Sequence, residues 1–338
     1  MIRVAINGFG RIGRRVFRLI LERNDMQVVA INDLADARTL SHLLKYDSIH
    51  GVSSHVISYS EEQIIVDDIS IPLLNDNHPK SIDWKPFDVN IVIESTGKFK
   101  TKKDLEFHLS NGANQVILSV PPIEDDIKTV VLGVNDKDIV GDETIISNAS
   151  CTTNNAAPMM SVIHQLCGIK QAYITTVHSY TTDQSLHDQP HKDLRRARAA
   201  GQSIVPTTTG AAKALTKIFP DLSDVIGGCG IRVPVANGSL TDITFNVKKE
   251  VSIKEINQAF KTASETYLKG ILQYTEDPIV SIDIVGNTHS CIFDSQMTSV
   301  IGNMVKIVGW YDNETGYSSR ILDLICNLSI KSLRLSNK

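Results

Sequence analysis

The stretch IRVAINGFGRIGR, residues 2–14, decides the fold of the N-terminal part of the chain. The stretch begins with a short apolar run of β-forming residues, and apolar residues at helical spacing follow that run. Between the two lie Gly8, Gly10 and Gly13, in the pattern G-x-G-x-x-G. In a strand–turn–helix unit the first glycine permits the tight turn, the second lets the backbone approach a pyrophosphate, and the third lets helix and strand pack closely. The stretch therefore predicts a dinucleotide-binding unit.

An acidic residue completes this pattern. Asp33 lies about 20 residues beyond Gly13, at the end of a second predicted strand, where such motifs carry the carboxylate that binds a ribose hydroxyl. A carboxylate repels a 2′-phosphate, so the sequence favours NAD over NADP as cofactor. The free N–H groups at the start of the following helix suit the pyrophosphate. The competing interpretation is a glycine-rich turn in an ordinary βα unit.

The pattern of elements changes near residue 150. Before it, short apolar strands alternate with helical stretches, which is typical of a parallel sheet. After it, the predicted strands are longer and several alternate, which favours a mixed or antiparallel sheet with helices on one face. We therefore expect an α/β protein: a Rossmann-type, doubly wound parallel-sheet domain at 1–150, an α+β catalytic domain at 151–315, and a C-terminal helix at 316–338.

Composition excludes several classes of protein. The chain has 338 residues, 42% of them hydrophobic, and a formal net charge of −4, so nothing in it requires nucleic acid or an anionic membrane. The N-terminus has no apolar core typical of a signal peptide, and no apolar run approaches the roughly 18 residues of a membrane span. The five cysteines are odd in number and widely spaced. We expect no disulfide framework, no metal site and a cytoplasmic location.

One cysteine has neighbours that suit a reactive thiol. Cys151 lies in NASCTTNN, residues 148–155, ahead of a predicted helix for which Ser150 is a suitable N-cap. A helix N-terminus stabilises a thiolate through its dipole and its free N–H groups. Pro158 lies inside that helix and weakens the prediction. The competing interpretation of Cys151 is a buried small hydrophobic residue.

A reactive thiol needs a base, and His178 is the first candidate. It ends a predicted strand and opens a long polar loop at 179–202, which is unusual for a compact domain. Other histidines compete with it for this role: His50, His187 and His191. Cations and hydroxyl groups that could bind phosphate follow: Arg195, Arg196, Arg198, Thr207, Thr208, Thr209, Gly210 and Arg232.

Seven stretches together make a family resemblance plain. They are INGFGRIGR, LKYDSIHG, SNASCTTN, PHKDLRRARAA, IVPTTTGAAKA, RVPV and WYDNETGYSSR. Together they run from the first strand to the last helix, and the chain resembles the phosphorylating glyceraldehyde-3-phosphate dehydrogenases of type I. The resemblance implies NAD-dependent oxidation of glyceraldehyde 3-phosphate to 1,3-bisphosphoglycerate. Cys151 would form a thiohemiacetal and then a thioester, His178 would move the proton, and inorganic phosphate would release the product.

The resemblance also implies roles for further residues, by position. Thr181 and Arg232 match the residues that bind the phosphate of the substrate, and Arg196 matches the arginine near both phosphates. The attacking phosphate would be bound by Ser150, Thr152, Thr209 and Gly210. The cofactor would be contacted by the glycine turn and by Arg11, Ile12, Asp33, Ser119 and Asn313. The loop at 179–202 resembles the S-loop that packs between subunits of a homotetramer, and the helix at 316–338 would return to the NAD-binding domain.

The sequence departs from the family pattern at a few positions. Asn155 stands where relatives usually have a second cysteine. Asn77 stands where many have an arginine near the adenine, and Thr315 replaces an aromatic or bulky residue. None of the three is Cys151 or His178.

Three other functions stay open at this level. An erythrose-4-phosphate dehydrogenase of the same superfamily would keep the thiol and the NAD site, but the intact PTTTGAAKA argues against its altered phosphate site. A thiol hydrolase or acyltransferase would use Cys151 and His178 without redox chemistry, and the glycine turn with Asp33 argues against it. A non-catalytic RNA-binding protein is disfavoured by the acidic charge.

Overall fold

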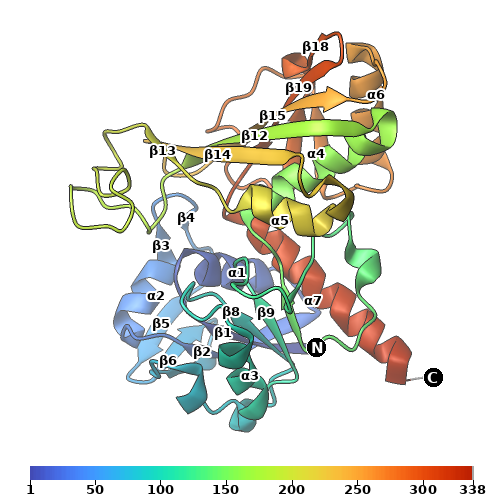
Figure 1. The fold of residues 1–338 in the computed structure, drawn as a ribbon. Helices are drawn as coiled ribbons and strands as arrows, with labels where there is room; N and C mark the ends of the chain where they lie inside the picture. The colour runs from blue at the N-terminus through green and yellow to red at the C-terminus, as the bar shows by residue number, and fades with distance from the viewer. Residues whose placement is uncertain (337–338) are drawn as a thin grey trace. The chain divides into compact units, whose positions relative to one another are not determined.

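The computed structural model describes residues 1–336, which divide into two compact units, each with its own sheet (Figure 1). The first unit consists of 1–130, 137–149 and 318–336, and the second of 131–136 and 150–317. No helix within 1–336 is long and apolar enough to cross a membrane. Each unit is described by itself below.

The first unit contains a nine-stranded sheet in the order β10–β11–β9–β8–β1–β2–β7–β6–β5. The pairs from β10 through β2 to β7 are parallel, and β7, β6 and β5 are antiparallel neighbours. The strands are β1 (Ile2–Asn7), β2 (Met26–Asn32), β5 (Ile57–Ser60), β6 (Gln63–Val66), β7 (Ile69–Leu74), β8 (Ile91–Glu94), β9 (Gln115–Leu118), β10 (Lys128–Thr129) and β11 (Ile145–Ser147). The predicted doubly wound parallel sheet is present, with an antiparallel extension at one edge.

Four helices belong wholly or partly to this unit. They are α1 (Arg11–Leu21), α2 (Ala37–Lys45), α3 (Lys102–Ser110) and α7 (Thr315–Ser336), which begins in the second unit. A short hairpin, β3 (Tyr46–Asp47) and β4 (Gly51–Val52), follows α2. The central strands are apolar and fully buried: Val4, Ala5 and Ile6 of β1 have no exposed surface. This is the burial expected of a parallel sheet covered on both faces.

The glycine turn between β1 and α1 depends on two close approaches. Gly8 has φ +92°, a left-handed conformation that favours glycine. A Cβ on Gly13 would lie 2.3 Å from the carbonyl oxygen of Gly8, so a side chain at Gly13 would push the helix away from the strand. Next to Gly10, by contrast, no protein atom would lie within 4 Å of a Cβ. The turn is therefore tight within the protein and open at Gly10, as a pyrophosphate requires.

The second unit contains an eight-stranded mixed sheet in the order β13–β14–β12–β15–β19–β17–β16, with β18 paired to β19. The pairs β12–β14 and β16–β17 are parallel and the others are antiparallel. The strands are β12 (Ile169–Ser179), β13 (Val205–Thr207), β14 (Ile226–Val233), β15 (Ser239–Val247), β16 (Leu272–Thr275), β17 (Cys291–Asp294), β18 (Ser299–Ile301) and β19 (Met304–Tyr311). The helices are α4 (Cys151–Cys167), α5 (Ala211–Ile218) and α6 (Ile253–Glu265).

Two helices begin at side-chain caps. Ser252 and Glu255 form a capping box at α6, with side chain bonded to backbone in both directions. Ser150 caps α4, because its hydroxyl oxygen accepts a hydrogen bond from the N–H of Thr153. Pro158 does not end the helix: α4 is 17 residues long and runs through the proline. α4 packs against β15, β17 and β19, and this tertiary packing supports the helix despite the proline.

Candidate active site

Cys151 and His178 come together in the second unit. Cys151 is the first residue of α4, and His178 is the penultimate residue of β12. The Sγ of Cys151 lies 3.4 Å from the Nε2 of His178, within hydrogen-bonding distance for sulfur. His178 is buried, whereas Cys151 is partly exposed. Of the histidines that the sequence offered, His178 is therefore the one that the fold brings to the thiol.

The second ring nitrogen of His178 faces two partners. Its Nδ1 lies 2.7 Å from the carbonyl oxygen of Ser179 and 2.5 Å from Nη1 of Arg232, which also donates to that carbonyl at 2.9 Å. A guanidinium can only donate, so the contact with Arg232 requires a bare Nδ1, whereas the contact with Ser179 requires a proton on it. When Nδ1 carries the proton, the ring donates to Ser179 and Nε2 presents its lone pair to Cys151. This tautomer is the one that a base requires.

Burial keeps both members of the pair neutral. It lowers the pKa of His178 to about 3, with the positive charge of Arg232 as the second cause. Burial also raises the pKa of the Cys151 thiol, while Arg232 and the N–H and hydroxyl groups of Thr152 act in the opposite direction. The sequence predicted a thiolate favoured by the helix N-terminus. The N–H groups at the start of α4 do act in that direction, but desolvation is the larger influence on the pKa of Cys151.

The lowered pKa of His178 has a consequence for stability. A histidine that stays neutral in the folded chain but takes a proton when unfolded makes the unfolded state bind more protons between about pH 6.5 and pH 3. Stability should therefore fall as pH drops through that window, by up to about 1.4 kcal/mol per pH unit from this group. In His178→Asn the loss of melting temperature between about pH 7.5 and pH 5 should be smaller than in the wild type. His187→Asn, on the exposed loop, is the control, and an equal loss in all three proteins would contradict the assignment.

Tyr311 forms the inner wall of the site, and the sequence reasoning gave it no role. It is the last residue of β19, and its hydroxyl lies 3.0 Å from the hydroxyl of Thr152 and 2.9 Å from that of Thr176. Its ring meets that of His178 edge-on, with 5.9 Å between the centroids. Burial raises the pKa of Tyr311, so the phenol stays protonated. A tyrosine on an apolar strand, directly before the polar run DNE, was the available signal.

The hydroxyl groups predicted to bind the attacking phosphate are bonded within the protein. Ser150 caps α4, and Thr152 pairs with Tyr311. Thr209 lies at the start of α5, where its hydroxyl accepts a hydrogen bond from the N–H of Ala211. Gly210 is the exposed N-cap residue of the same helix.

Arg196 links this region to the polar loop. Its guanidinium pairs with Asp183 at 2.5 Å and donates to the hydroxyl of Thr207 at 2.9 Å. Its charge also helps to lower the pKa values of both His178 and Arg232. Arg196 therefore lies near the thiol–imidazole pair, while Arg195 and Arg198 belong to the exposed part of the loop. Thr181 lies two residues beyond β12 and is partly exposed.

A separate cleft of about 210 Å³ lies in the first unit, around the glycine turn. Its wall is formed by the ends of β1, β2 and β8 and by the residues that follow them. The lining residues are Asn7, Gly8, Gly10, Asn32, Asp33, Leu34, Asp76, Asn77, Ser95, Thr96, Lys98 and Phe99. The carboxyl ends of parallel strands meet here, which is where nucleotides bind in open α/β sheets.

Asp33 lies in this cleft, one residue beyond β2 rather than at its end as predicted. One of its carboxylate oxygens accepts the N–H of Phe9 at 2.7 Å, and the other accepts the N–H of Ala35 at 3.0 Å. Asp33 therefore also holds the glycine turn in place. Arg11 and Ile12 begin α1, and the guanidinium of Arg11 pairs with the buried Asp47 at 2.7 Å.

The other two predicted cofactor contacts lie in different units. Ser119 follows β9 in the first unit, and its N–H donates to the carbonyl oxygen of Glu94. Asn313 is buried in the second unit, where its Oδ1 accepts hydrogen bonds from Ser179, Gly238 and Ser239. Any further contact of Asn313 would have to come from its amide nitrogen. Within residues 1–336, no group of three or more His, Cys, Asp or Glu side chains is arranged to hold a metal ion.

Comparison with known proteins gives a family match for each half of the chain. Residues 2–102 match the family model of the glyceraldehyde 3-phosphate dehydrogenase NAD binding domain, and residues 150–313 match that of the C-terminal domain. The chain is 49% identical over 335 residues to glyceraldehyde-3-phosphate dehydrogenase 1 of Bacillus cereus, covering 98% of this chain and 100% of the relative. It is 50% identical over 334 residues to the glyceraldehyde-3-phosphate dehydrogenase of Geobacillus stearothermophilus, covering 98% and 99%. With that of Thermotoga maritima it shares 51% over 328 residues, covering 96% and 98%.

These matches cover almost the whole length of both partners, and they join a dinucleotide domain to a domain whose first helix begins with a cysteine. The cofactor of the matched N-terminal domain is NAD. The chain belongs to the glyceraldehyde 3-phosphate dehydrogenase family and is an NAD-dependent oxidoreductase.

Proposed function

We propose that the chain oxidises glyceraldehyde 3-phosphate to 1,3-bisphosphoglycerate, with Cys151 as nucleophile and His178 as base. One observation carries the proposal: Sγ of Cys151 lies 3.4 Å from Nε2 of a buried, neutral imidazole in a chain of this family. The relatives reported above are named for glyceraldehyde 3-phosphate, which favours that substrate over erythrose 4-phosphate.

The residues of the site would act in sequence. Nε2 of His178 takes the thiol proton as Sγ attacks the aldehyde carbon, and then passes that proton to the aldehyde oxygen, which gives a neutral thiohemiacetal. His178 then takes the hydroxyl proton as the carbon loses hydride, which leaves a thioester on Cys151. Bound NAD supplies one piece of chemistry, the acceptance of that hydride. A phosphate oxygen attacks the thioester carbon, the C–S bond breaks, and Cys151 regains its proton while the acyl phosphate leaves.

We assign the cofactor to the cleft of the first unit. The open space beside Gly10, the exposed start of α1 and the carboxylate of Asp33 fit a pyrophosphate and a ribose. Arg11, Ile12, Gly13, Ser119 and Asn313 would complete the set of cofactor contacts. In domain terms, residues 1–150 would bind NAD, 151–315 would carry catalysis, and 316–338 would belong with the NAD-binding domain.

We assign the substrate phosphate to Arg232 and Thr181. Arg232 is a partly buried cation near the end of β14, and its guanidinium lies against His178. The attacking phosphate would meet Thr209 and Gly210 at the start of α5, with Arg196 beside it through Thr207 and Thr208. For Ser150 and Thr152 this role requires that their hydroxyl groups give up part of their present hydrogen bonds.

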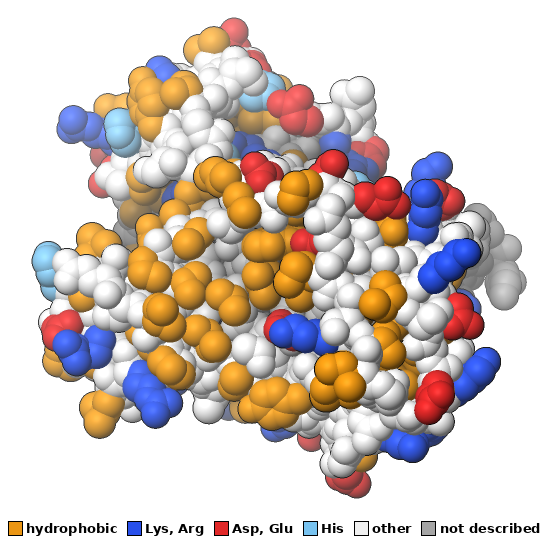
Figure 2. Space-filling view, turned by 90° about the horizontal axis from the view of Figure 1, so that it is seen from above, with side chains coloured by type: hydrophobic (Ala, Val, Ile, Leu, Met, Phe, Trp, Pro, Cys, Tyr) orange, Lys and Arg blue, Asp and Glu red, His pale blue; other side chains and the backbone are white. Residues whose placement is uncertain are grey.

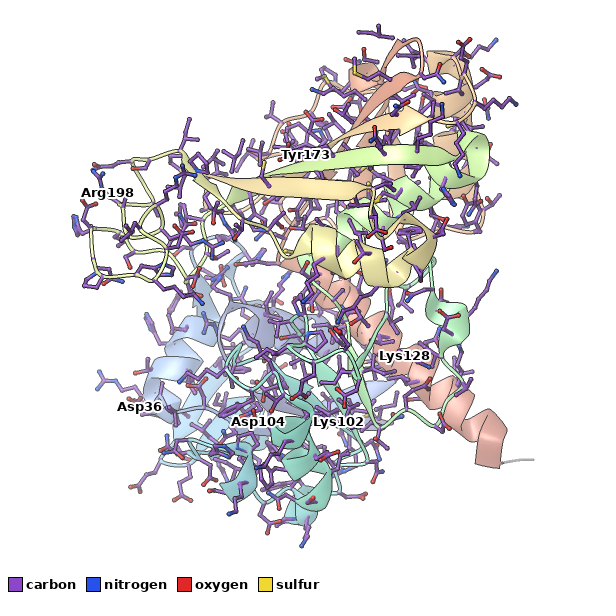
Figure 3. The ribbon with its side chains drawn as sticks, viewed as in Figure 1. Asp36, Lys102, Asp104, Lys128, Tyr173 and Arg198 are labelled. Atoms are coloured by element: carbon purple, nitrogen blue, oxygen red, sulfur yellow. The ribbon has the colours of Figure 1, made fainter. Side chains whose placement is uncertain are left out.

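A homotetramer would use the exposed apolar surface of the second unit. Tyr173 on β12 (Figure 3) and Met304 on β19 are about half exposed on strands, and the loop at 179–202 carries Leu186 and Leu194 in the open. Figure 2 shows hydrophobic side chains gathered over a broad part of the face seen from above. Exposed apolar area of this kind favours association. We also propose a cytoplasmic location, because all five cysteines are free thiols.

A direct assay tests the function. Purified protein should form NADH from glyceraldehyde 3-phosphate and NAD in repeated turnovers only when inorganic phosphate is present. Without phosphate a single turnover per active site should remain, because the thioester has no acceptor. Faster turnover with erythrose 4-phosphate would move the assignment to that activity, and product formed without NAD would indicate a hydrolase.

The substrate-phosphate site predicts a selective loss in Arg232→Leu. The KM for glyceraldehyde 3-phosphate should rise by about tenfold or more, and far more than that for unphosphorylated glyceraldehyde, because a charge-assisted contact needs the phosphate. The pKa of Cys151 should also rise, since Arg232 is the largest influence that lowers it. Steady-state kinetics and the pH dependence of alkylation by iodoacetamide measure the two effects.

Arg198→Leu is the matched control for Arg232→Leu. Arg198 lies in the loop (Figure 3), pairs with Asp188 and is mostly exposed. Its replacement should leave both measurements unchanged. Equal losses with the phosphorylated and unphosphorylated aldehydes in Arg232→Leu would show that Arg232 acts only through the fold or through His178.

The cofactor cleft predicts a change of preference in Asp33→Ala. The substitution removes the charge that repels a 2′-phosphate, so the preference for NAD over NADP should fall by about tenfold or more. NAD itself should bind more weakly, because the N–H of Phe9 loses its acceptor. The ratio of kcat/KM values for the two cofactors measures the effect, with the exposed Asp142→Ala as control. An unchanged ratio would place the ribose elsewhere.

A further inference from the structure

A buried polar network lies at the floor of the cofactor cleft, and the proposed catalytic steps do not use it. It consists of Trp84, His108, Glu94, Asn7 and Asn32. Asn7, Asn32 and Glu94 end the neighbouring strands β1, β2 and β8, and His108 lies on α3. Glu94, His108 and Trp84 have no exposed surface. A carboxylate so deeply buried is costly unless its oxygens are fully bonded.

The direction of each hydrogen bond follows from Trp84. The indole Nε1 can only donate, and it lies 3.0 Å from Nδ1 of His108, so this nitrogen accepts. The ring proton is then on Nε2, which donates to Oε2 of Glu94 at 3.2 Å. A second proton on His108 would point at the indole N–H. The indole therefore orients His108 so that its Nε2–H is aimed at the carboxyl group of Glu94.

Four donors converge on Glu94. Besides His108, Nδ2 of Asn7 donates to Oε2 at 2.5 Å, while the N–H and the hydroxyl of Thr96 donate to Oε1 at 2.9 and 2.5 Å. In each of these contacts a carboxylate oxygen is the acceptor, so the arrangement uses both oxygens of Glu94. Asn7 is oriented as a result: its Oδ1 accepts from Asn32, whose own Oδ1 accepts the N–H of Asp76.

This network sets the wall against which the glycine turn is built. A Cβ on Gly8 would lie 2.6 Å from the nitrogen of Thr96, so the backbone at Thr96 packs directly on the turn. The hydroxyl of Ser95 also donates to the carbonyl oxygen of Gly8 at 2.7 Å. Because the N–H and the hydroxyl of Thr96 both end on Glu94, the position of the turn depends on that carboxylate. Asn7, Gly8, Asn32, Asp76 and Thr96 all line the cleft.

We propose that Glu94, oriented by His108 and Trp84, is a positioning residue for NAD: its two buried acceptor oxygens hold Thr96, Asn7 and the glycine turn in the binding geometry. The proposal rests on the proposed function only in taking this cleft as the NAD site. It predicts a loss of cofactor affinity that exceeds any loss in the chemical step, because the catalytic pair belongs to the other unit.

Glu94→Gln is the sharpest test, because it keeps the shape and replaces one acceptor oxygen by a donor. The amide has one acceptor oxygen and one NH₂ group. In one orientation the NH₂ faces the N–H of Thr96, and in the other it faces the N–H groups of His108 and Asn7. In both orientations a donor therefore faces a donor. The Kd for NAD, measured by calorimetry on the full chain, should rise by about tenfold or more. The kcat at saturating NAD should fall far less, and the rate of Cys151 alkylation should not change. Glu61→Gln, on an exposed turn, is the control.

A pair of His108 variants separates positioning from mere packing. His108→Gln retains an N–H that can reach Glu94, and His108→Leu fills similar space without one. The first should keep most of the NAD affinity and the second should lose it as Glu94→Gln does. If Glu94→Gln does not fold, these two variants decide the question.

Two outcomes would overturn the proposal. One is an unchanged Kd for NAD in folded Glu94→Gln, and the other is equal losses in both His108 variants with kcat falling in parallel. Failure of the proposed function looks different, since wild-type protein would then not bind NAD at all or would bind it without oxidising the aldehyde.

Discussion

Cys151→Ser should lose at least about 10⁴-fold in kcat for aldehyde oxidation while it binds NAD as well as the wild type. A serine hydroxyl is a far weaker nucleophile than a cysteine thiol, because the pKa of the hydroxyl is high. His178 as a base cannot compensate for that difference. The cofactor cleft belongs to the other unit and does not contain Cys151. Stopped-flow NADH formation and calorimetric NAD binding measure the two halves of this prediction.

Cys229→Ser is a fitting control, because Cys229 is another partly exposed thiol of the same unit. It should retain its activity. Near-normal turnover of Cys151→Ser would contradict the covalent mechanism. Loss of NAD binding in Cys151→Ser would show that the substitution disturbs more than the nucleophile.

His178→Asn should slow aldehyde oxidation by about 10²–10⁴-fold without abolishing it, because general-base help of that size is lost while the nucleophile remains. Arg232 should still lower the pKa of Cys151, since its charge acts on the thiol directly. The pH dependence of iodoacetamide alkylation should therefore change much less in His178→Asn than in Arg232→Leu.

Single-turnover kinetics with glyceraldehyde 3-phosphate measure the loss in His178→Asn, and His191→Asn serves as control in the same loop region. His191 is held by Asp183 and Asp193 rather than by the thiol. A wild-type rate in His178→Asn would assign the proton transfer to another group.

Much of the fold was predictable because local patterns and tertiary structure agree. Gly8, Gly10 and Gly13 fixed the βα turn, and the capping box at Ser252 fixed the start of α6. The short strands β5, β6 and β7 went unpredicted, because an antiparallel edge on a parallel sheet has no distinct local pattern. Pro158 misled for the same reason: only packing of α4 on the sheet shows that the helix survives it.

The site was predictable as a set of residues but not as an electrostatic environment. A cysteine at a helix start and a histidine at a strand end were visible in the sequence. The raised pKa of Cys151 was not, because it depends on burial and on Arg232, which is 81 positions away in the chain. Tyr311 and Glu94 were missed because a tyrosine and a glutamate at strand ends read as ordinary surface residues until their burial is known.

The structure explains some of the departures from the family pattern and leaves others unexplained. Asn155 is buried, and its amide donates to the carbonyl oxygens of Ser290 and Trp310, two contacts that a cysteine could not make together. Asn77, for which the family resemblance implied an arginine, lines the cofactor cleft. Thr315 is buried at the first residue of α7, and nothing in the structure explains why it replaces a larger residue.

Trapping the acyl-enzyme tests the central claim most directly. Protein mixed with glyceraldehyde 3-phosphate and NAD, without inorganic phosphate, should gain the mass of one 3-phosphoglyceroyl group per active chain. Peptide mapping at mildly acidic pH should place that group on the peptide that contains Cys151, and added phosphate should remove it within the time of a turnover. NADH formed with no adduct on any cysteine, or an adduct on a cysteine other than Cys151, would contradict the account.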